Sequence, residues 1–420
     1  MNNLKKIFIK FSVIILLLLS TACNQSDSPE IKRFIIEKIP RLIGVGSGLT
    51  RYEKTRAKRD SSYFYTVSDG GNQPAIVEIT IKKSIASVIN TFEIVSDQKL
   101  DLEDIAIGPN GNFWLANEIG PSLIEFNPSS SKIIEILSPG LGLPDILKNI
   151  QPGRGFESLA IDGNTLIAAL QSVLNIKGES KSKAQFIRFL VFDLKSKKSK
   201  MLAYPIEISS DGTRKDYQLT GMTAISKSKV LIIEQELGVL QKGVLREETL
   251  SAAKIFLCDL SNATDLTDLS LNNQELEFEE DRGALFGSLL SKKGAVITPI
   301  EKKLILNLSD IGWTLPNPEG IAILDDYKTI VLSNDNNSSE AAFWQIELNT
   351  PLKINWWKRV LWSIGIIIMF LTVIWSFSFK EKPISFKVKT SPDDLELEIE
   401  TENKDNHSKL QKSLPKIKDF

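Results

Sequence analysis

The sequence predicts an all-β fold and, within that class, a β-propeller of about six blades, with five or seven as alternatives. Short runs of alternating apolar residues fill the middle of the chain, broken by Gly, Pro, Asn and Asp, as is typical of strands and turns. One strand–turn–strand phrase recurs through this region, whereas helical candidates are confined to residues 143–149 and 281–291. Repeated strand units bury their faces against neighbouring copies, as the blades of a propeller do.

The recurring phrase consists of an acidic or turn residue, an apolar–Ala–apolar strand, a polar turn and a second apolar strand. The four clear copies begin at Glu103, Glu157, Gly221 and Glu319, and a fainter copy runs from Gly46 to Asp69. The copies lie roughly fifty residues or more apart, about the size of a blade. The last interval is wide enough for one more degenerate copy, and for this reason we expect six blades.

Two apolar segments flank the propeller region. We expect a signal peptide of the lipoprotein type over residues 1–23, a tether over 24–33, the propeller over 34–352, a transmembrane helix over 356–379 and a polar, disordered tail over 380–420. Lysines, an uncharged stretch and small residues before Cys23 are typical of an export signal. This segment resembles that of a bacterial lipoprotein lipidated at Cys23. An ordinary signal peptide and an uncleaved anchor are the alternatives.

The second apolar segment has no charged residue from Val360 to Phe379. At about 1.5 Å per residue, a helix of this length crosses the roughly 30 Å hydrocarbon layer of a membrane. The tail after it is rich in charged residues and cannot bury enough apolar surface to fold, apart from an amphipathic stretch at 395–399 that could dock on a partner. We therefore expect a cell-membrane protein with an extracytoplasmic (periplasmic or extracellular) propeller and a cytoplasmic tail. The sequence does not indicate which partner the tail would bind.

The composition excludes several classes of function. The 51 basic and 52 acidic residues nearly balance, so no nucleic-acid partner is expected. The single histidine, His407, lies in the polar tail, which excludes catalysis or metal binding by a histidine cluster. Cys23 and Cys258 offer no disulfide framework, and Cys258 alternates with apolar residues in a predicted strand, as a buried cysteine does.

Acidic residues at equivalent positions of a circular repeat are expected to converge. The first strands contribute Glu103, Glu157 and Glu319 to one ring, and the ends of the second strands contribute Asp69, Glu118, Glu234 and Asp335. Like charges held close together repel one another unless a cation or a basic partner offsets them, so these residues predict a metal site. The alternative is that each carboxylate accepts backbone N–H bonds and caps turns within its own blade.

At these residues the chain resembles the phytase-like domain family, also described as the esterase-like activity of phytase family. The motifs are Ser68-Asp69-Gly70-Gly71, Asp101-Leu102-Glu103, Gly153-Arg154-Gly155-Phe156-Glu157, Val191-Phe192-Asp193, Thr220-Gly221-Met222, Asn317-Pro318-Glu319-Gly320 and Ser333-Asn334-Asp335. The resemblance implies an exported propeller and, by analogy with the propeller phytases, calcium-assisted attack of water on a phosphate ester. The chain departs from the family at Gln171, where relatives often carry a glutamate, and at Gln235, where an arginine often follows the glutamate.

The motifs and the family resemblance are compatible with two functions. In the first, the seven carboxylates above hold Ca²⁺, which lowers the pKa of a bound water, and the catalytic residues acting on a small phosphorylated substrate are Glu157, Arg154 and Glu319. Arg154 would bind a phosphoryl oxygen. In the second, the propeller is a non-catalytic binding or scaffold module at the membrane surface. A propeller fold is compatible with both functions. The departures from the family at Gln171 and Gln235 weaken the catalytic case, so the two functions are equally supported.

Overall fold

The structure is a computed structural model that describes residues 29–36, 43–53, 61–70, 74–82, 85–175, 186–206, 217–236, 253–267, 297–313, 315, 317–334, 342–353, 384–390 and 395–401. The chain divides into two units, residues 1–353 and 354–420, which are described separately. The predicted signal peptide and transmembrane helix lie outside the described residues. Among the residues that are described, we find no helix long and apolar enough to cross a membrane.

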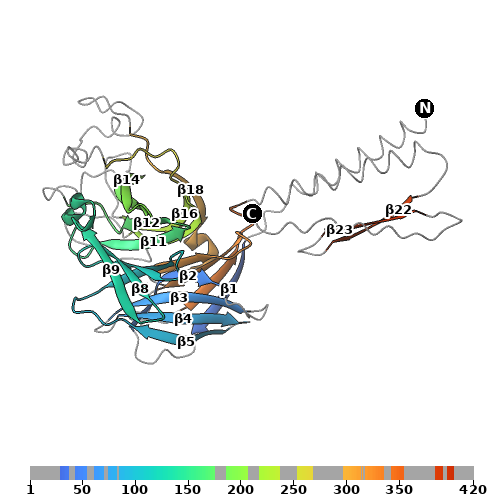
Figure 1. The fold of residues 1–420 in the computed structure, drawn as a ribbon, viewed down its shortest axis with the longest axis horizontal. Coiled ribbons are helices and arrows are strands. Elements are labelled where there is room, and N and C mark those ends of the chain that lie inside the picture. The colour runs from blue at the N-terminus through green and yellow to red at the C-terminus, as the bar shows by residue number, and fades with distance from the viewer. Residues whose placement is uncertain are drawn as a thin grey trace. The chain divides into compact units, whose positions relative to one another are not determined.

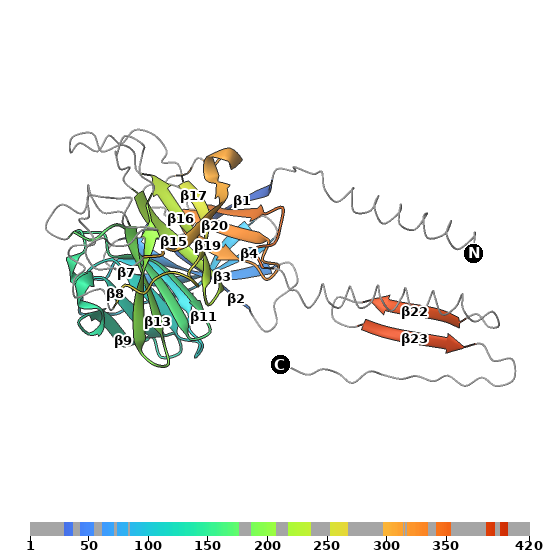
Figure 2. The ribbon, with the colours of Figure 1, turned by 90° about the horizontal axis from the view of Figure 1, so that it is seen from above.

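The first unit is a five-bladed β-propeller whose blades follow one another along the chain (Figures 1 and 2). Blade one comprises β2 (Ile43–Tyr52), β3 (Ser61–Gly70), β4 (Ala75–Lys82) and β5 (Ile85–Glu93). Blade two comprises β6 (Leu102–Ile107), β7 (Phe113–Asn117), β8 (Ser122–Asn127), β9 (Lys132–Pro139) and the short β10 (Gly142–Leu143). Blade three comprises β11 (Phe156–Asp162), β12 (Thr165–Leu170), β13 (Phe186–Asp193) and β14 (Lys198–Pro205).

The last two blades follow the same antiparallel order. Blade four comprises β15 (Tyr217–Ser226), β16 (Lys229–Glu236), β17 (Ala253–Asp259) and β18 (Glu301–Asn307). Blade five comprises β19 (Pro318–Ile323), β20 (Thr329–Asn334), β21 (Ala342–Glu347) and β1 (Glu30–Ile36). Short 3₁₀ helices, η2 (Asp145–Asn149) and η5 (Leu308–Ile311), follow blades two and four. The strands expected from the alternating apolar runs therefore form, and η2 occupies the first of the two expected helices.

The structure has five blades, one of the two alternatives to the six that we expected. The wide interval before the last copy holds the outer strands of blade four, because β17 and β18 are neighbours in its sheet although residues 260–300 separate them in the chain. The inner strands β2, β6, β11, β15 and β19 each contact the next, and β19 contacts β2, which closes a ring of five. The interval thus contains a long connection within one blade instead of a further blade.

The ring is closed by the N-terminal strand. β1 pairs antiparallel with β21, from Glu30 opposite Glu347 to Ile35 opposite Ala342, and so completes the last blade with the first strand of the chain. In both views the blue β1 lies beside the orange strands of blade five (Figures 1 and 2). The end of the predicted tether at residues 24–33 therefore belongs to the propeller from Glu30 onward, because the last blade would otherwise lack its outer strand.

The core lies between the blades. Four clusters of buried apolar residues fill the interfaces around the ring, with the largest extending through blades two, three and four. The second strands carry continuous apolar runs such as Phe113–Asn117, which is buried throughout, because both faces of the blade are covered by its neighbours. Apolar burial between sheets is therefore the main stabilising contribution to the ring.

A buried carboxylate on the ring axis joins four blades. Asp104 accepts the backbone N–H of Ile105 in its own blade at 2.8 Å, of Leu159 in blade three at 2.7 Å and of Met222 in blade four at 3.3 Å. The backbone N–H of Leu49 in blade one bonds to it as well. Burial raises the pKa of Asp104 well above its usual range, although these N–H donors act in the opposite direction. The inner strands are thus held together at their centre by one side chain.

The second unit contains a two-stranded antiparallel hairpin of β22 (Ile384–Thr390) and β23 (Leu395–Thr401). These strands lie in the tail that we expected to be disordered, and β23 includes the amphipathic stretch 395–399. The register pairs Lys387 with Glu398 and Lys389 with Glu396. This alternation of charged and apolar residues favours a hairpin.

Candidate functional site

The first strand of every blade carries a β-bulge at the same place. The pairing with the second strand skips at Val45/Ser47, Leu102/Asp104, Phe156/Ser158, Leu219/Met222 and Pro318/Gly320. A bulge leaves its extra residue outside the ladder and changes the direction of its side chain. The extra residues of blades two, three and five are Glu103, Glu157 and Glu319, so these three carboxylates occupy equivalent positions at the same end of the ring.

Blade two gathers three carboxylates at this end. Ligand oxygens of Asp101, Glu103 and Glu118 all lie within 4.8 Å of one another. Asp101 and Glu103 flank the start of β6, and Glu118 follows the last residue of β7. The backbone N–H of Glu118 donates to the carbonyl of Asp101 at 2.9 Å, and the N–H of Asp101 donates to the Asn117 side chain at 2.7 Å. Local backbone bonds therefore position the cluster.

Two carboxylates of the cluster have raised pKa values. Burial raises the pKa of Asp101, and Lys99 partly opposes this effect. Burial and the nearby charge of Asp101 raise the pKa of Glu118, and Arg154 partly opposes them. Burial is the larger cause for both groups, and a cation bound beside them would favour their ionised forms.

The segment that leads into β11 packs directly against this cluster. Gly155 lies so close to the backbone of Glu118 that a Cβ at this position would overlap with the Glu118 carbonyl oxygen. Gly153 has a positive φ of 65°, and a Cβ there would lie 3.9 Å from Oε2 of Glu118. The two glycines of the Gly153-Arg154-Gly155 motif thus allow Arg154 to lie beside the acidic cluster of the neighbouring blade.

Arg154 and Glu157 are joined through Gln171. Nη1 of Arg154 donates to Oε1 of Gln171 at 2.6 Å, and Nε2 of Gln171 donates to Oε1 of Glu157 at 2.7 Å. An amide can accept from the guanidinium and donate to the carboxylate at once, which a glutamate at this position could not do while ionised. Glu157 is therefore held in blade three, beside the cluster but outside its three members.

Glu319 and Glu234, two other predicted ligands, have hydrogen-bond partners of their own. Glu319 accepts a hydrogen bond from the Ser47 hydroxyl at 2.7 Å, which links blade five to blade one. Glu234 is buried and accepts from the Tyr204 hydroxyl at 2.6 Å and from Lys302 Nζ at 2.9 Å. These bonds fit the alternative that the carboxylates support the blades themselves. Asp335 lies outside the described residues, as does the side chain of Asp69.

Comparison with known proteins identifies the family. Residues 47–338, more than half of the chain, match the model of the family described as "Phytase-like: Esterase-like activity of phytase". The chain belongs to this phytase-like family. The match begins in the inner strand of blade one and ends beyond β20 of blade five, so it extends across all five blades of the ring.

Individual relatives of this phytase-like chain are distant. An uncharacterized secreted protein of Arthroderma benhamiae is 24% identical over 243 residues, in a match that covers 48% of this chain and 45% of that protein. The chain thus spans about half the length of the curated relative it matches. Among solved structures, the catalytic domain of Coprinopsis cinerea GH62 α-L-arabinofuranosidase is 8% identical with a TM-score of 0.41, covering 78% of this chain and 99% of that one. A luciferin-regenerating enzyme is 10% identical with a TM-score of 0.35 and the same coverages.

Sequence reasoning missed Asp101 as a member of the acidic cluster of blade two. The residue precedes β6, outside the strand phrase by which the copies were aligned, and among the described residues only blade two has a carboxylate there together with one after its second strand. The signal was present in the motif Asp101-Leu102-Glu103, where two carboxylates two positions apart begin an inner strand. Contacts between different segments of blade two bring Asp101 to the other two carboxylates, Glu103 and Glu118.

Proposed function

We propose that this propeller is a divalent-cation-dependent hydrolase of phosphate esters that uses Ca²⁺ held by Asp101, Glu103 and Glu118. The proposal depends on one observation, the approach of these three carboxylates to within 4.8 Å. Ca²⁺ binds carboxylate oxygens at about 2.3–2.6 Å, so oxygens at this separation can share one ion. The raised pKa values of Asp101 and Glu118 support a cation at this place.

The residues of the chain have separate roles in this proposal. When bound, the ion would lower the pKa of a coordinated water and offset phosphate charge. Arg154, beside Glu118, would bind a phosphoryl oxygen, because a guanidinium suits planar two-point contact with phosphate. Gln171 would fix the orientation of Arg154 through the bond at 2.6 Å, and Glu157 would fix Gln171 in turn. Glu319 has no role in this version, since its partner Ser47 lies in blade one.

A binding or scaffold module is the second candidate function. The bonds of Gln171 engage both Arg154 and Glu157, the two side chains that the sequence assigns to catalysis in blade three. In this version the acidic cluster and its cation form a rigid surface for a ligand that is not turned over. Both versions require the cation, but only the first requires hydrolysis.

The test uses the purified full-length protein after treatment with EGTA. Adding Ca²⁺ should raise the melting temperature, since a ligand that binds only the folded state stabilises it, and should restore release of phosphate from p-nitrophenyl phosphate or phytate. Asp101→Asn, Glu103→Gln and Glu118→Gln should each reduce both effects. Glu301→Gln, which removes an exposed carboxylate from β18, should leave both unchanged.

The outcomes separate the two functions. Stabilisation by Ca²⁺ without turnover of either phosphate ester would favour the binding module. The cation site would be ruled out in both versions if Ca²⁺ did not change the melting temperature of the parent protein. It would also be ruled out if Ca²⁺ raised the melting temperature of all three cluster variants as much as that of the parent.

We also propose that the propeller is displayed on the extracytoplasmic side of the cell membrane, with lipid on Cys23 and the segment 356–379 as a transmembrane helix. Mass spectrometry of the N-terminal peptide should find a diacylglyceryl group on Cys23. Cys23→Ser should lose this group yet remain in the membrane fraction through the helix. Removal of residues 354–420 in the Cys23→Ser background should give a soluble protein. Full release of the Cys23→Ser variant from the membrane fraction, with residues 354–420 intact, would contradict the transmembrane helix.

A further inference from the structure

A cavity lies on the ring axis, at the opposite end from the acidic cluster. It has a volume of about 330 Å³ and is lined by the later residues of the inner strands, including Leu49–Tyr52 of β2 and Ile105–Ile107 of β6, and by Glu53, which follows β2. The acidic cluster lies at the start of β6, whereas this cavity lies where β6 ends. The two places are therefore separate sites on one axis.

The cavity is a blind cup. Its lining includes Leu49, Ile105, Leu159 and Met222, whose backbone N–H groups all bond to the buried carboxylate of Asp104. These four residues and the Asp104 carboxylate form the floor of the cup. A cavity of this volume is at the small end of the range of sites that bind small molecules.

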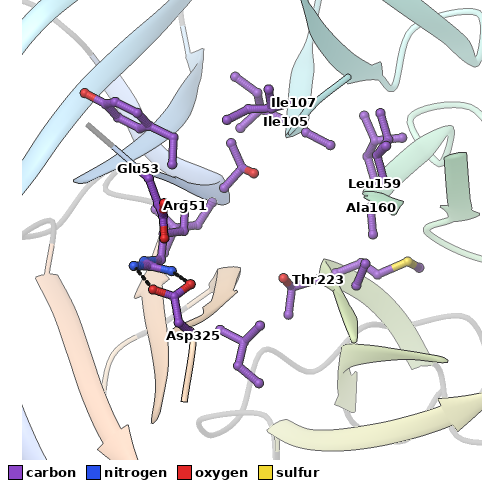
Figure 3. A pocket seen from close by; sticks show the side chains of 16 residues that line it. Arg51, Glu53, Ile105, Ile107, Leu159, Ala160, Thr223 and Asp325 are labelled. Carbon is purple, nitrogen blue, oxygen red and sulfur yellow. Dashed lines mark hydrogen bonds and ion pairs between the residues drawn. The ribbon is translucent and has the colours of Figure 1, made fainter. Parts of the chain in front are cut away.

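The walls of the cup differ in character. Arg51, Glu53 and Asp325 lie together on one side, whereas Ile105, Ile107, Leu159 and Ala160 lie on the other (Figure 3). Both Nη atoms of Arg51 bond to the two carboxylate oxygens of Asp325. Asp325 thus already neutralises the guanidinium, and Glu53 leaves the polar wall with one excess negative charge.

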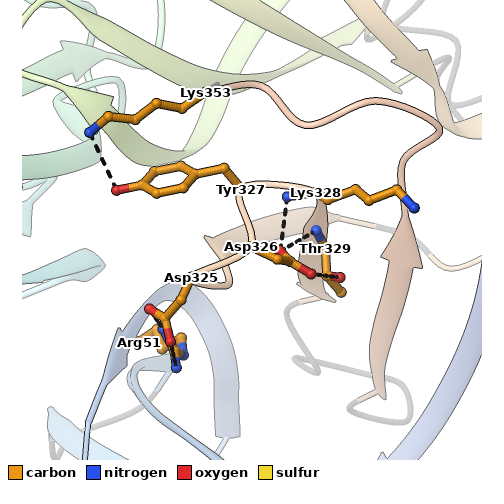
Figure 4. A network of polar contacts seen from close by, with 7 residues as sticks. All are labelled: Arg51, Asp325, Asp326, Tyr327, Lys328, Thr329 and Lys353. Carbon is orange, nitrogen blue, oxygen red and sulfur yellow. Dashed lines mark hydrogen bonds and ion pairs between the residues drawn. The ribbon is translucent and has the colours of Figure 1, made fainter. Parts of the chain in front are cut away.

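The rim that carries Asp325 is fixed by its own turn. Asp326 accepts bonds from the backbone N–H groups of Lys328 and Thr329 at 2.8 Å each and from the Thr329 hydroxyl at 2.6 Å (Figure 4). Burial raises the pKa of Asp326, but these bonds outweigh it and lower the pKa overall. The next residue, Tyr327, lies beneath the ammonium of Lys353, 4.9 Å from the ring centre. Asp325 therefore faces the cup from an ordered turn.

We infer that this cup binds a small organic cation, a primary amine on a short apolar body. The ammonium would lie against Glu53 and Asp325, and the apolar body would contact the isoleucine and leucine side chains opposite. An anion is disfavoured because both Nη atoms of Arg51 already bond to Asp325 and the wall is negative overall. A neutral molecule of the same shape would gain the apolar contacts alone.

The test compares three probes that share one ring and differ in charge: benzylamine, benzyl alcohol and benzoate. Binding to the full-length protein is followed by saturation-transfer NMR and by calorimetric titration. Benzylamine should bind about tenfold or more tightly than benzyl alcohol, the size of one charge-assisted hydrogen bond, and benzoate should not bind. Equal binding of the three probes, tighter binding of benzoate, or no binding of benzylamine would overturn the inference.

Variants locate the binding. Glu53→Gln, a change at an exposed residue, should reduce benzylamine affinity several-fold and leave benzyl alcohol unaffected. Thr223→Leu places bulk in the cup from a half-buried position and should abolish binding of both, whereas the near-isosteric Thr223→Val should retain it. Glu103→Gln, in the acidic cluster at the opposite end of the ring, should retain benzylamine binding too. The test of the cup is therefore independent of the proposed hydrolase. Benzylamine binding that survives Thr223→Leu would place the probe elsewhere and overturn the inference.

Discussion

Gln171 donates a hydrogen bond to Glu157 across 2.7 Å while it accepts one from Arg154. The amide therefore holds an acidic and a basic side chain in one line beside the cluster of blade two. Relatives that carry a glutamate here would need a different arrangement, because two ionised carboxylates at this distance repel each other. The difference from the family thus changes the geometry of the site as well as its charge.

Gln171→Glu should destabilise the protein at pH 7 by about 1–3 kcal/mol, since it replaces a buried donor with a like charge. Repulsion between Glu157 and the introduced carboxylate raises the pKa of this pair in the folded state, so the folded variant binds an extra proton below that pKa. Stability is then regained as the pH falls, and the loss measured by urea unfolding should be smaller at pH 5 than at pH 7. A loss independent of pH would contradict this account.

Asp104→Ala should cost about 3 kcal/mol or more of unfolding free energy, because it leaves backbone N–H groups of four blades buried without their acceptor. The matched control is Ser158→Ala, which removes a single bond from Ser158 to the carbonyl of Thr220 and should cost about 1 kcal/mol. Urea unfolding of both variants measures the difference. Equal losses would show that Asp104 does not join the blades.

Gly155→Ala should destabilise the propeller by about 2–4 kcal/mol, because the added Cβ overlaps with the carbonyl of Glu118 and the two blades must separate locally. Gly120→Ala, in the turn after β7, meets no atom within 4 Å but has a φ of 63°, so it should cost only about 1 kcal/mol. Thermal unfolding compares the two. Gly155→Ala should also weaken Ca²⁺ binding, which the control should not.

Ca²⁺ affinity should fall as the pH is lowered from 7 to 5, further than ordinary carboxylates would allow. The raised pKa values of Asp101 and Glu118 mean that the cation-free folded protein retains protons to a higher pH than ordinary carboxylates do, and Ca²⁺ must displace them. For the same reason the cation-free protein loses stability as the pH rises through these pKa values, and Ca²⁺ restores it. Calorimetric titration in buffers of different ionisation enthalpy counts the released protons; no release at pH 5 would contradict the prediction.

Lys99→Gln provides a further check on this electrostatic account. Lys99 lowers the pKa of Asp101, so its removal should raise that pKa and move the pH at which Ca²⁺ binding weakens upward. At pH 7 the variant should bind Ca²⁺ slightly more tightly, because one nearby positive charge is gone. Lys132→Gln, an exposed change on β9, should alter neither quantity.

Much of the propeller could be predicted from local patterns. Alternating apolar residues predicted strands such as β4 and β16, and the repeated phrase predicted equivalent positions for Glu103, Glu157 and Glu319, which are β-bulges in the structure. The blade number was missed because a long connection inside blade four has the length of a blade. The role of β1 was missed because the pairing of residues 30–36 with β21 joins the two ends of the propeller, and no local signal reports such a contact.

The sequence by itself determined the fold class, the blade repeat and the end of the ring where carboxylates occur, because each depends on residues close together in the chain. Only the tertiary structure decided which carboxylates meet. It grouped Asp101 with Glu103 and Glu118, paired Glu234 with Lys302 and Tyr204, and enclosed Asp104 among the N–H groups of four blades. Charges interact over a few ångströms in space, and that proximity is set by how the blades pack.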